Sequence, residues 1–179
     1  MGKEAVVFRY GHRSVRDYRV TSHCCLVARA FGAKKIIING AQDESIENTV
    51  RGVSKRWGNG FSVEFEENWR NGLKKLKEGG YLIVHATMYG LPLQKVEKKL
   101  KNEKKICVVA GSQKVEREVY NLADMNVSVT QQPHSEIAAI AMLLDRFFTG
   151  KELGKKFAGA EQKIIPHAKG KKVEKIRPV

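Results

Sequence analysis

Short, continuously apolar runs alternate with amphipathic stretches along most of this chain. Such runs are typical of strands that are buried on both faces of a parallel sheet. We predict strands at residues 5–10, 35–39, 61–65, 81–86, 105–110 and 126–130. Apolar positions three or four residues apart predict helices between them, at residues 21–31, 45–57, 69–76, 92–100, 115–122 and 135–148. This alternation predicts an α/β fold with a mainly parallel sheet flanked by helices.

The pattern weakens after Gly150, where lysines become frequent. We predict one α/β domain over residues 1–150 and a basic C-terminal extension over residues 151–179, with one strand at residues 163–166. The extension is interpreted as an electrostatic arm for a polyanion. A partly ordered, solvated chain end is the alternative.

The net charge narrows the class of partner. Lysine and arginine number 33 against 19 acidic residues, which gives a formal net charge of +14 over 179 residues. Such an excess favours a polyanionic partner, most often a nucleic acid. The alternative is a lysine-rich protein in which the charge serves only solvation.

The cysteines and the apolar runs indicate the cellular compartment of the protein. Cys24 and Cys25 are adjacent, Cys107 stands apart, and no Cys-x-x-Cys pair occurs. This argues against a disulfide framework and against a zinc site, so we predict no metal and a reducing cytoplasm. No signal sequence is evident and no apolar run approaches membrane-spanning length, so we predict no membrane partner.

Small polar segments follow three of the predicted strands. They are TMYG (residues 87–90), GSQK (111–114) and QQPHS (131–135). Carboxyl ends of parallel strands meet at one edge of a sheet, which is where ligands bind in open α/β folds. Gly90 and Gly111 allow close approach of backbone to a ligand, and the helix start at Ser135 adds N–H donors. These features predict a small-molecule site, with ordinary turn chemistry as the alternative.

Several well-known ligand motifs are missing. The chain has no G-x-x-x-x-G-K-[ST] segment, and its GNG cluster at residues 58–60 follows a predicted helix rather than a strand. A P-loop nucleotidase and a dinucleotide-dependent oxidoreductase are therefore disfavoured.

A second polar cluster, RYGHRSVRDYRVTSH, spans residues 9–23 and is rich in arginine and histidine. It lies between the first predicted strand and the first predicted helix. Its side chains are predicted to contact phosphate or ribose. The alternative is a surface loop in which Asp17 pairs with an arginine.

These motifs together resemble one family. YGHRSVRDYRVTSH, WGNGF, HATMYG, VAGSQK and QQPHSEIAAI are similar to segments of the archaeal tRNA (cytidine-56) ribose 2′-O-methyltransferases of the SPOUT superfamily. The resemblance covers nearly the whole chain. It implies a deep trefoil knot in the C-terminal part of the domain, S-adenosylmethionine as cofactor, tRNA as substrate, and a homodimer.

The resemblance also implies residue roles. It places cofactor binding on the three strand ends, at Ala86, Thr87, Ala110, Gly111, Ser112, Gln113, Lys114, Ser128, Val129, Thr130, Gln131, Gln132, Pro133, His134 and Ser135. Ala86 departs from the family, which more often has leucine there. AGSQK likewise replaces a commoner GAEK-type segment.

The same resemblance identifies Arg19 as the catalytic arginine of the first motif. A guanidinium is a poor base because its pKa exceeds about 12, so His23 is the second candidate. Asp17 is expected to orient either side chain, with Tyr120 and Asn126 as supports. RNA contacts are predicted at Arg9, His12, Arg13 and Arg16. Another tRNA or rRNA ribose remains an alternative target, and a non-catalytic RNA-binding protein is the alternative class.

Overall fold

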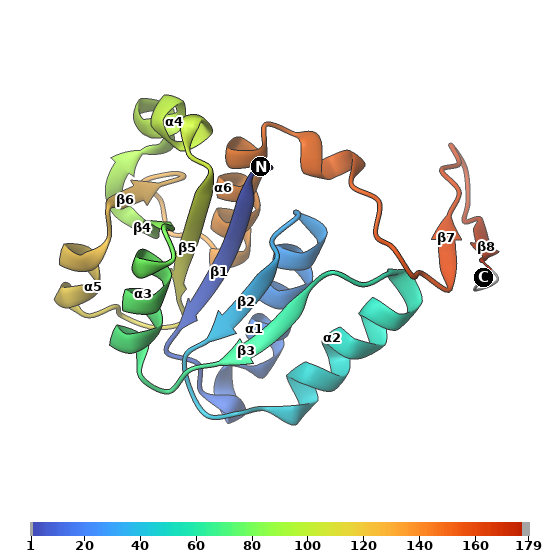
Figure 1. Ribbon diagram of the computed structural model, residues 1–179, viewed down its shortest axis with the longest axis horizontal. Helices are drawn as coiled ribbons and strands as arrows, with labels where there is room; N and C mark the ends of the chain where they lie inside the picture. The colour runs from blue at the N-terminus through green and yellow to red at the C-terminus, as the bar shows by residue number, and fades with distance from the viewer. Residues whose placement is uncertain (1, 177–179) are drawn as a thin grey trace.

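A six-stranded parallel sheet forms the centre of the molecule (Figure 1). The computed structural model describes residues 2–176. The strand order is β3-β2-β1-β5-β4-β6, and each neighbouring pair is parallel. The strands are β1 (Glu4–Tyr10), β2 (Lys35–Ile38), β3 (Ser62–Phe65), β4 (Leu82–Pro92), β5 (Lys105–Gly111) and β6 (Met125–Ser128).

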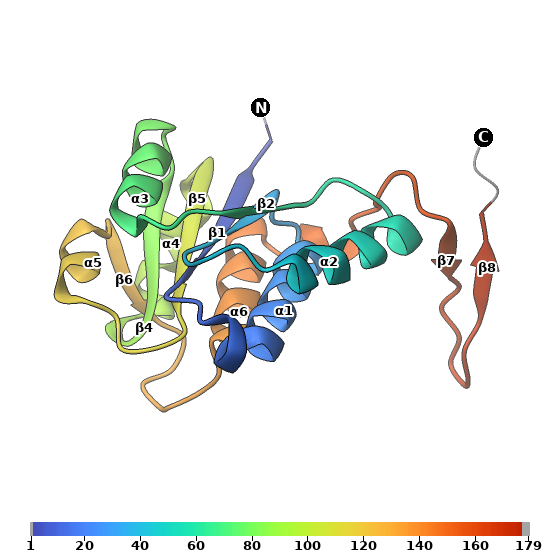
Figure 2. The same ribbon diagram turned by 90° about the horizontal axis from the view of Figure 1, so that it is seen from below.

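Helices cover both faces of this sheet (Figures 1 and 2). One face packs against α1 (Ser14–Ala30), α2 (Glu44–Trp57), α4 (Leu93–Asn102) and α6 (Glu136–Phe148). The other packs against α3 (Trp69–Glu78) and α5 (Arg117–Leu122). Side chains along β1 alternate between the two cores, with Val7 in the first and Val6 and Phe8 in the second. The predicted α/β fold with a mainly parallel sheet is confirmed.

The three cysteines lie inside these cores. Cys24 and Cys25 are buried on α1 and Cys107 is buried on β5, all as free thiols. Burial raises the pKa of each thiol above its ordinary value, because the thiolate would lose its hydration. They are therefore small core residues.

Helix α1 begins earlier than the sequence pattern predicts, at Ser14 rather than near residue 21. Its N-cap residue Arg13 makes no capping bond through its side chain. Instead, the Asp17 carboxylate accepts a hydrogen bond from the Arg13 backbone N–H at 3.0 Å and so closes the first turn. The segment between the predicted strand and helix is thus helical from Ser14, so Arg16 and Arg19 lie on a helix together with His23, which was predicted there.

Strand β4 is longer than predicted and runs on through TMYG to Pro92. Its register against β6 shifts between Ala86 and Leu91, which leaves the intervening residues as an irregularity at the sheet edge. Gly90 lies there against the backbone of β6. A Cβ atom at Gly90 would come within 2.5 Å of the Asn126 carbonyl group and the Val127 nitrogen. The close approach expected of Gly90 is therefore to β6 and not to a ligand.

We expect Gly90→Ala to lower the free energy of unfolding by about 1–3 kcal/mol, because main-chain atoms of β6 must move to admit the methyl group. Gly52→Ala is the matched control. Gly52 lies within α2 with no atom near its missing Cβ, so the same change should be neutral or should stabilise by up to about 1 kcal/mol. Urea unfolding of both variants checks this, and equal stabilities would contradict the packing argument.

The C-terminal extension leaves the body of the molecule as a small hairpin (Figures 1 and 2). After the short helix η1 (Lys151–Gly154), strands β7 (Gln162–Ile164) and β8 (Val173–Lys175) pair antiparallel. Phe157 fixes the connection to the body, since its ring lies 4.4 Å from the Arg29 guanidinium. The strand expected at residues 163–166 begins one residue earlier and ends two residues earlier, and its partner strand was not predicted. Among residues 2–176, no helix is long and apolar enough to cross a membrane.

Candidate active site

A cavity of about 400 Å³ opens beside the middle of β4 and the carboxyl ends of β5 and β6. This volume lies within the range of small-molecule sites. The lining residues are His85, Ala86, Thr87, Met88, Tyr89, Gly111, Gln113, Lys114, Val115, Tyr120, Val127, Val129, Pro133, His134, Glu136 and Ala139. All three predicted segments contribute, so the parallel sheet does bring them to one place.

Eight of the predicted cofactor residues line this cavity: Ala86, Thr87, Gly111, Gln113, Lys114, Val129, Pro133 and His134. Seven lie outside the lining: Ala110, Ser112, Ser128, Thr130, Gln131, Gln132 and Ser135. Two of the latter have clear structural duties. The Ser112 hydroxyl donates to the Tyr10 carbonyl at 3.1 Å, which joins β5 to β1. The Ser135 hydroxyl accepts from the Ile137 N–H at 3.3 Å and caps α6.

The cavity is apolar at depth and charged at its mouth. Val127 and Ala139 are buried, whereas Lys114 and His134 are exposed to solvent. Glu136 is half-buried at the start of α6, where free N–H groups favour negative charge. The site thus suits a ligand with one flat apolar part and one charged part.

His85 was not predicted from the sequence, yet it lines this cavity with only 1% of its surface exposed. Its Nδ1 atom lies 2.9 Å from the Asn126 Oδ1 atom, and its ring meets the Tyr120 ring edge-on at 4.6 Å. The Tyr120 hydroxyl lies 3.0 Å from the Thr87 hydroxyl. Burial lowers the pKa of His85, against the opposing effect of the Asn126 hydrogen bond. Tyr120 and Asn126 therefore hold His85, and not Arg19 or His23 as expected.

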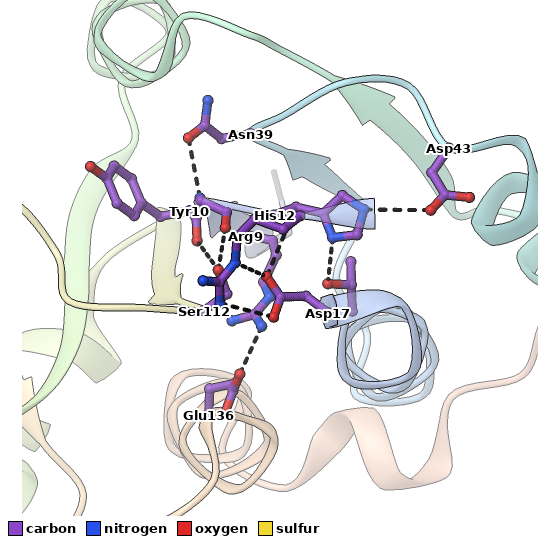
Figure 3. Close-up of polar contacts among 11 residues, drawn as sticks. Arg9, Tyr10, His12, Asp17, Asn39, Asp43, Ser112 and Glu136 are labelled. Carbon is purple, nitrogen blue, oxygen red and sulfur yellow. Dashed lines mark hydrogen bonds and ion pairs between the residues drawn. The ribbon is translucent and has the colours of Figure 1, made fainter. Parts of the chain in front are cut away.

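Arg9 is buried and belongs to the interior of the protein (Figure 3). Its Nη2 atom lies 2.7 Å from the Glu136 Oε1 atom, and only 1% of the arginine side chain is exposed. The ion pair joins β1 to the first residue of α6 at the cavity wall. The expectation that Arg9 contacts RNA is wrong for this structure, because solvent does not reach its guanidinium.

His12 is also buried rather than available to RNA (Figure 3). Its Nδ1 atom lies 3.0 Å from the Thr21 hydroxyl, and its Nε2 atom lies 3.5 Å from the Asp43 carboxylate. Asp43 in turn caps α2 by accepting from the Ser45 and Ile46 N–H groups. Burial lowers the pKa of His12, although Asp43 opposes this shift. The side chain therefore ties α1 to the start of α2.

Arg13 and Asp17 form an ion pair at the start of α1, with the Arg13 Nε atom 2.9 Å from the Asp17 carboxylate. These hydrogen bonds lower the pKa of Asp17. Asp17 is thereby engaged, so it does not orient Arg19 or His23 as expected. Both of those side chains are exposed on α1, and neither lines the cavity.

The two buried histidines predict a pH dependence of stability. A lowered pKa means that the folded state favours neutral imidazole. The contribution of each histidine to the free energy of unfolding is therefore fully present above the ordinary histidine pKa of about 6.5. It declines as the pH falls below that value. In wild type the decline is at most about 1.4 kcal/mol per pH unit for each group.

His12→Asn keeps a polar atom near Thr21 and removes one of these groups. We expect its stability deficit relative to wild type to shrink between pH 7 and pH 5, because wild type alone loses the His12 contribution. Urea unfolding across this range measures the difference. A deficit that does not change with pH would contradict the assignment.

Comparison with known proteins now gives the family. The family described as "tRNA ribose 2′-O-methyltransferase, aTrm56" matches residues 57–174. A tRNA (cytidine(56)-2′-O)-methyltransferase of Methanopyrus kandleri is 47% identical over 171 residues, which are 96% of each chain. The enzyme of the same description from Pyrococcus horikoshii is 50% identical over 176 residues, covering 96% of this chain and 85% of its own length.

Solved structures share the fold at low identity. The A. aeolicus TrmH/SpoU tRNA modifying enzyme superposes with a TM-score of 0.62 and 17% identity, over 84% of this chain and 76% of that one. An AdoMet-bound rRNA methyltransferase from Sinorhizobium meliloti gives 0.62 and 16%, over 82% of this chain. This chain spans only 56% of that longer protein. The extent of the sequence match and the shared fold lead to one conclusion: the chain belongs to the tRNA ribose 2′-O-methyltransferase family, aTrm56.

Proposed function

We propose that this protein transfers a methyl group from S-adenosylmethionine to the ribose 2′-oxygen of cytidine 56 in the T loop of tRNA. The observation that carries the proposal is a cavity lined by β4 and by the segments that follow β5 and β6, in a chain of this family. Bound S-adenosylmethionine supplies a methyl group on a sulfonium, which is already a good leaving group. The reaction therefore needs no metal ion to activate it.

The residues of the cavity fit this cofactor. Its buried apolar side chains suit a purine, and the exposed Lys114 suits a carboxylate group. We propose that Gly111 and the segments 110–114 and 128–135 hold the cofactor largely through backbone groups. Gly111 leaves little room for a side chain, since a Cβ there would meet Val115 at 2.5 Å. Ser112 and Ser135 act by fixing the cavity walls.

Arg19 is our proposed catalytic residue, supplied to the cavity of a partner subunit. It lies on an exposed surface of α1 and outside the cavity of its own chain. Val15 is 99% exposed on the same helix, and Tyr18 and Val20 are partly exposed, which is costly unless another chain covers them. A homodimer through α1 would cover these side chains and deliver Arg19. There it would position and polarise the 2′-hydroxyl, with His23 one turn away as the second candidate base.

The RNA surface is proposed to include Arg13, Arg16 and the basic hairpin. Arg16 is exposed on α1, and the hairpin carries Lys163 and Lys175 away from the body. Such groups bind phosphates without reading bases. The target lies where the T and D loops of tRNA meet, so its exposure costs a few kcal/mol of unstacking. We place this activity in the cytoplasm.

We further propose the deep trefoil knot. Strand β6 lies at the sheet edge beside β4, whereas the following helix α6 packs on α1, α4 and β5. After β6 the chain must therefore turn back toward the centre of the sheet to reach the position of α6. A chain that is threaded through a loop to form the knot would take this course. Stretching the unfolded chain by its ends tests this, because a tightened knot shortens the extended length. A full contour length would count against the knot.

Methyl transfer tests the function directly. Labelled S-adenosylmethionine is incubated with unmodified tRNA and with the same tRNA carrying 2′-deoxycytidine at position 56. We expect label on the first RNA only. Label on both would indicate another target nucleotide, and label on neither, without cofactor binding, would overturn the enzyme assignment.

A further inference from the structure

His85 is the most deeply buried polar side chain of the cavity, and its hydrogen bonds fix where its proton lies. The Asn126 amide nitrogen donates to the Tyr120 carbonyl oxygen at 2.9 Å. This turns the Asn126 oxygen toward the His85 Nδ1 atom, at 2.9 Å. An amide oxygen can only accept a hydrogen bond, so Nδ1 carries the proton.

The other ring nitrogen is then a fixed acceptor. In a neutral imidazole with a protonated Nδ1, the Nε2 atom holds the lone pair. No hydrogen bond to Nε2 is formed within residues 2–176. The edge-on contact with Tyr120, at 4.6 Å, and the link from Tyr120 to Thr87 hold the ring in place. Nε2 is thus the ring atom left for a ligand.

The polarity of the cavity indicates which part of the ligand reaches His85. His85 meets the ring of Tyr120 on α5, and Val115 of the same lining packs against the apolar core on that face of the sheet, whereas Lys114 and His134 are exposed to solvent. The flat, least hydrated part of S-adenosylmethionine is adenine, and its amino-acid end is charged. Burial of the apolar part brings adenine to the deep wall. Adenine carries one exocyclic amino group, which is a hydrogen-bond donor.

We propose that the His85 Nε2 atom accepts a hydrogen bond from the exocyclic amino group of the cofactor's adenine. His85 is then a specificity-determining residue that selects adenine over 6-oxopurines. Asn126 and Tyr120 are positioning residues that act through it. This inference rests on the cofactor assigned in the proposed function.

Paired ligands test the proposal. Calorimetry compares S-adenosylhomocysteine with S-inosylhomocysteine, in which a carbonyl oxygen replaces the amino group. Wild type should prefer the adenosyl compound by at least about tenfold, because the inosyl oxygen would face the Nε2 lone pair. His85→Leu should reduce this preference to about twofold. His167→Leu, an exposed histidine outside the cavity, is the control and should keep the wild-type preference.

A second variant separates recognition from folding. Asn126→Asp still accepts the Nδ1 proton, but its charge raises the pKa of the imidazole. As the pH falls from 8 to 6, Nε2 becomes a donor in this variant, and its affinity for the adenosyl compound should fall. Wild-type affinity should stay level, since burial keeps its ring neutral. Nitrogen-15 NMR of the free protein reports the tautomer directly.

The outcomes are distinct. Equal binding of both ligands by wild type, or a proton on Nε2 in the free protein, overturns the role of His85 while the cofactor assignment stands. An unchanged preference in His85→Leu does the same. Binding of neither ligand by wild type overturns the cofactor assignment, and this inference with it.

Discussion

Arg19→Ala should lower the rate of methyl transfer by about 100-fold or more, whereas the affinity for S-adenosylmethionine should change by less than about twofold. The reason is that Arg19 lies outside the cavity of its own chain and, in the proposed function, acts only on the reacting oxygen. Single-turnover rates and calorimetric affinities measure the two effects separately. Arg16→Ala, on an exposed position of the same helix, should mainly raise KM for tRNA.

A mixing experiment tests which subunit supplies Arg19. Gly111→Val fills the cavity, because a Cβ at Gly111 already meets Val115. Each variant alone should be inactive. Dimers formed from Arg19→Ala and Gly111→Val chains should recover activity if Arg19 acts across the interface, since one intact site then remains. No recovery, with mixed dimers shown to form, would place Arg19 in its own chain's site or outside catalysis.

Glu136→Gln should lower the free energy of unfolding by about 3 kcal/mol or more. The change keeps the shape of the side chain but leaves the buried Arg9 guanidinium without its ion-pair partner. Two further Arg9 nitrogens, Nε and Nη1, have no hydrogen-bond partner within residues 2–176, so little else compensates. Urea unfolding of wild type and of Glu136→Gln measures this difference in the free energy of unfolding.

The double variant Arg9→Met/Glu136→Leu is the control for this prediction. It removes both charges and should regain much of the lost stability. Glu97→Gln, at an exposed ion pair with Lys101, should cost less than about 1 kcal/mol. A loss below about 1 kcal/mol for Glu136→Gln would show that solvent reaches Arg9.

Much of the fold could be predicted because its elements have local signals. Continuous apolar runs marked β1, β2 and β5 to within a residue or two, and Ser135 marked the start of α6. The start of α1 could not be predicted in this way. Its first turns face solvent, so they show no apolar stripe, and its closing hydrogen bond comes from Asp17 inside the helix.

The site was predicted in part. The sequence pointed to three strand ends, and parallel strands bring these together whatever their order. It did not reveal Arg9 as a core residue, since Glu136 lies far along the chain and the pair meets only after folding. It missed His85 for a similar reason. A histidine within an apolar strand resembles a core residue until Asn126 is placed beside it.

The buried cysteines allow transient local unfolding to be detected by thiol labelling, without any substitution in the protein. Cys24 and Cys25 lie on α1, which has an exposed outer surface, whereas Cys107 lies on β5 in the middle of the sheet. A thiol reagent can reach each only when its own surroundings open. Labelling rates at these positions would therefore resolve whether α1 detaches while the sheet stays intact. Such a detachment would interrupt the proposed presentation of Arg19 to a partner subunit.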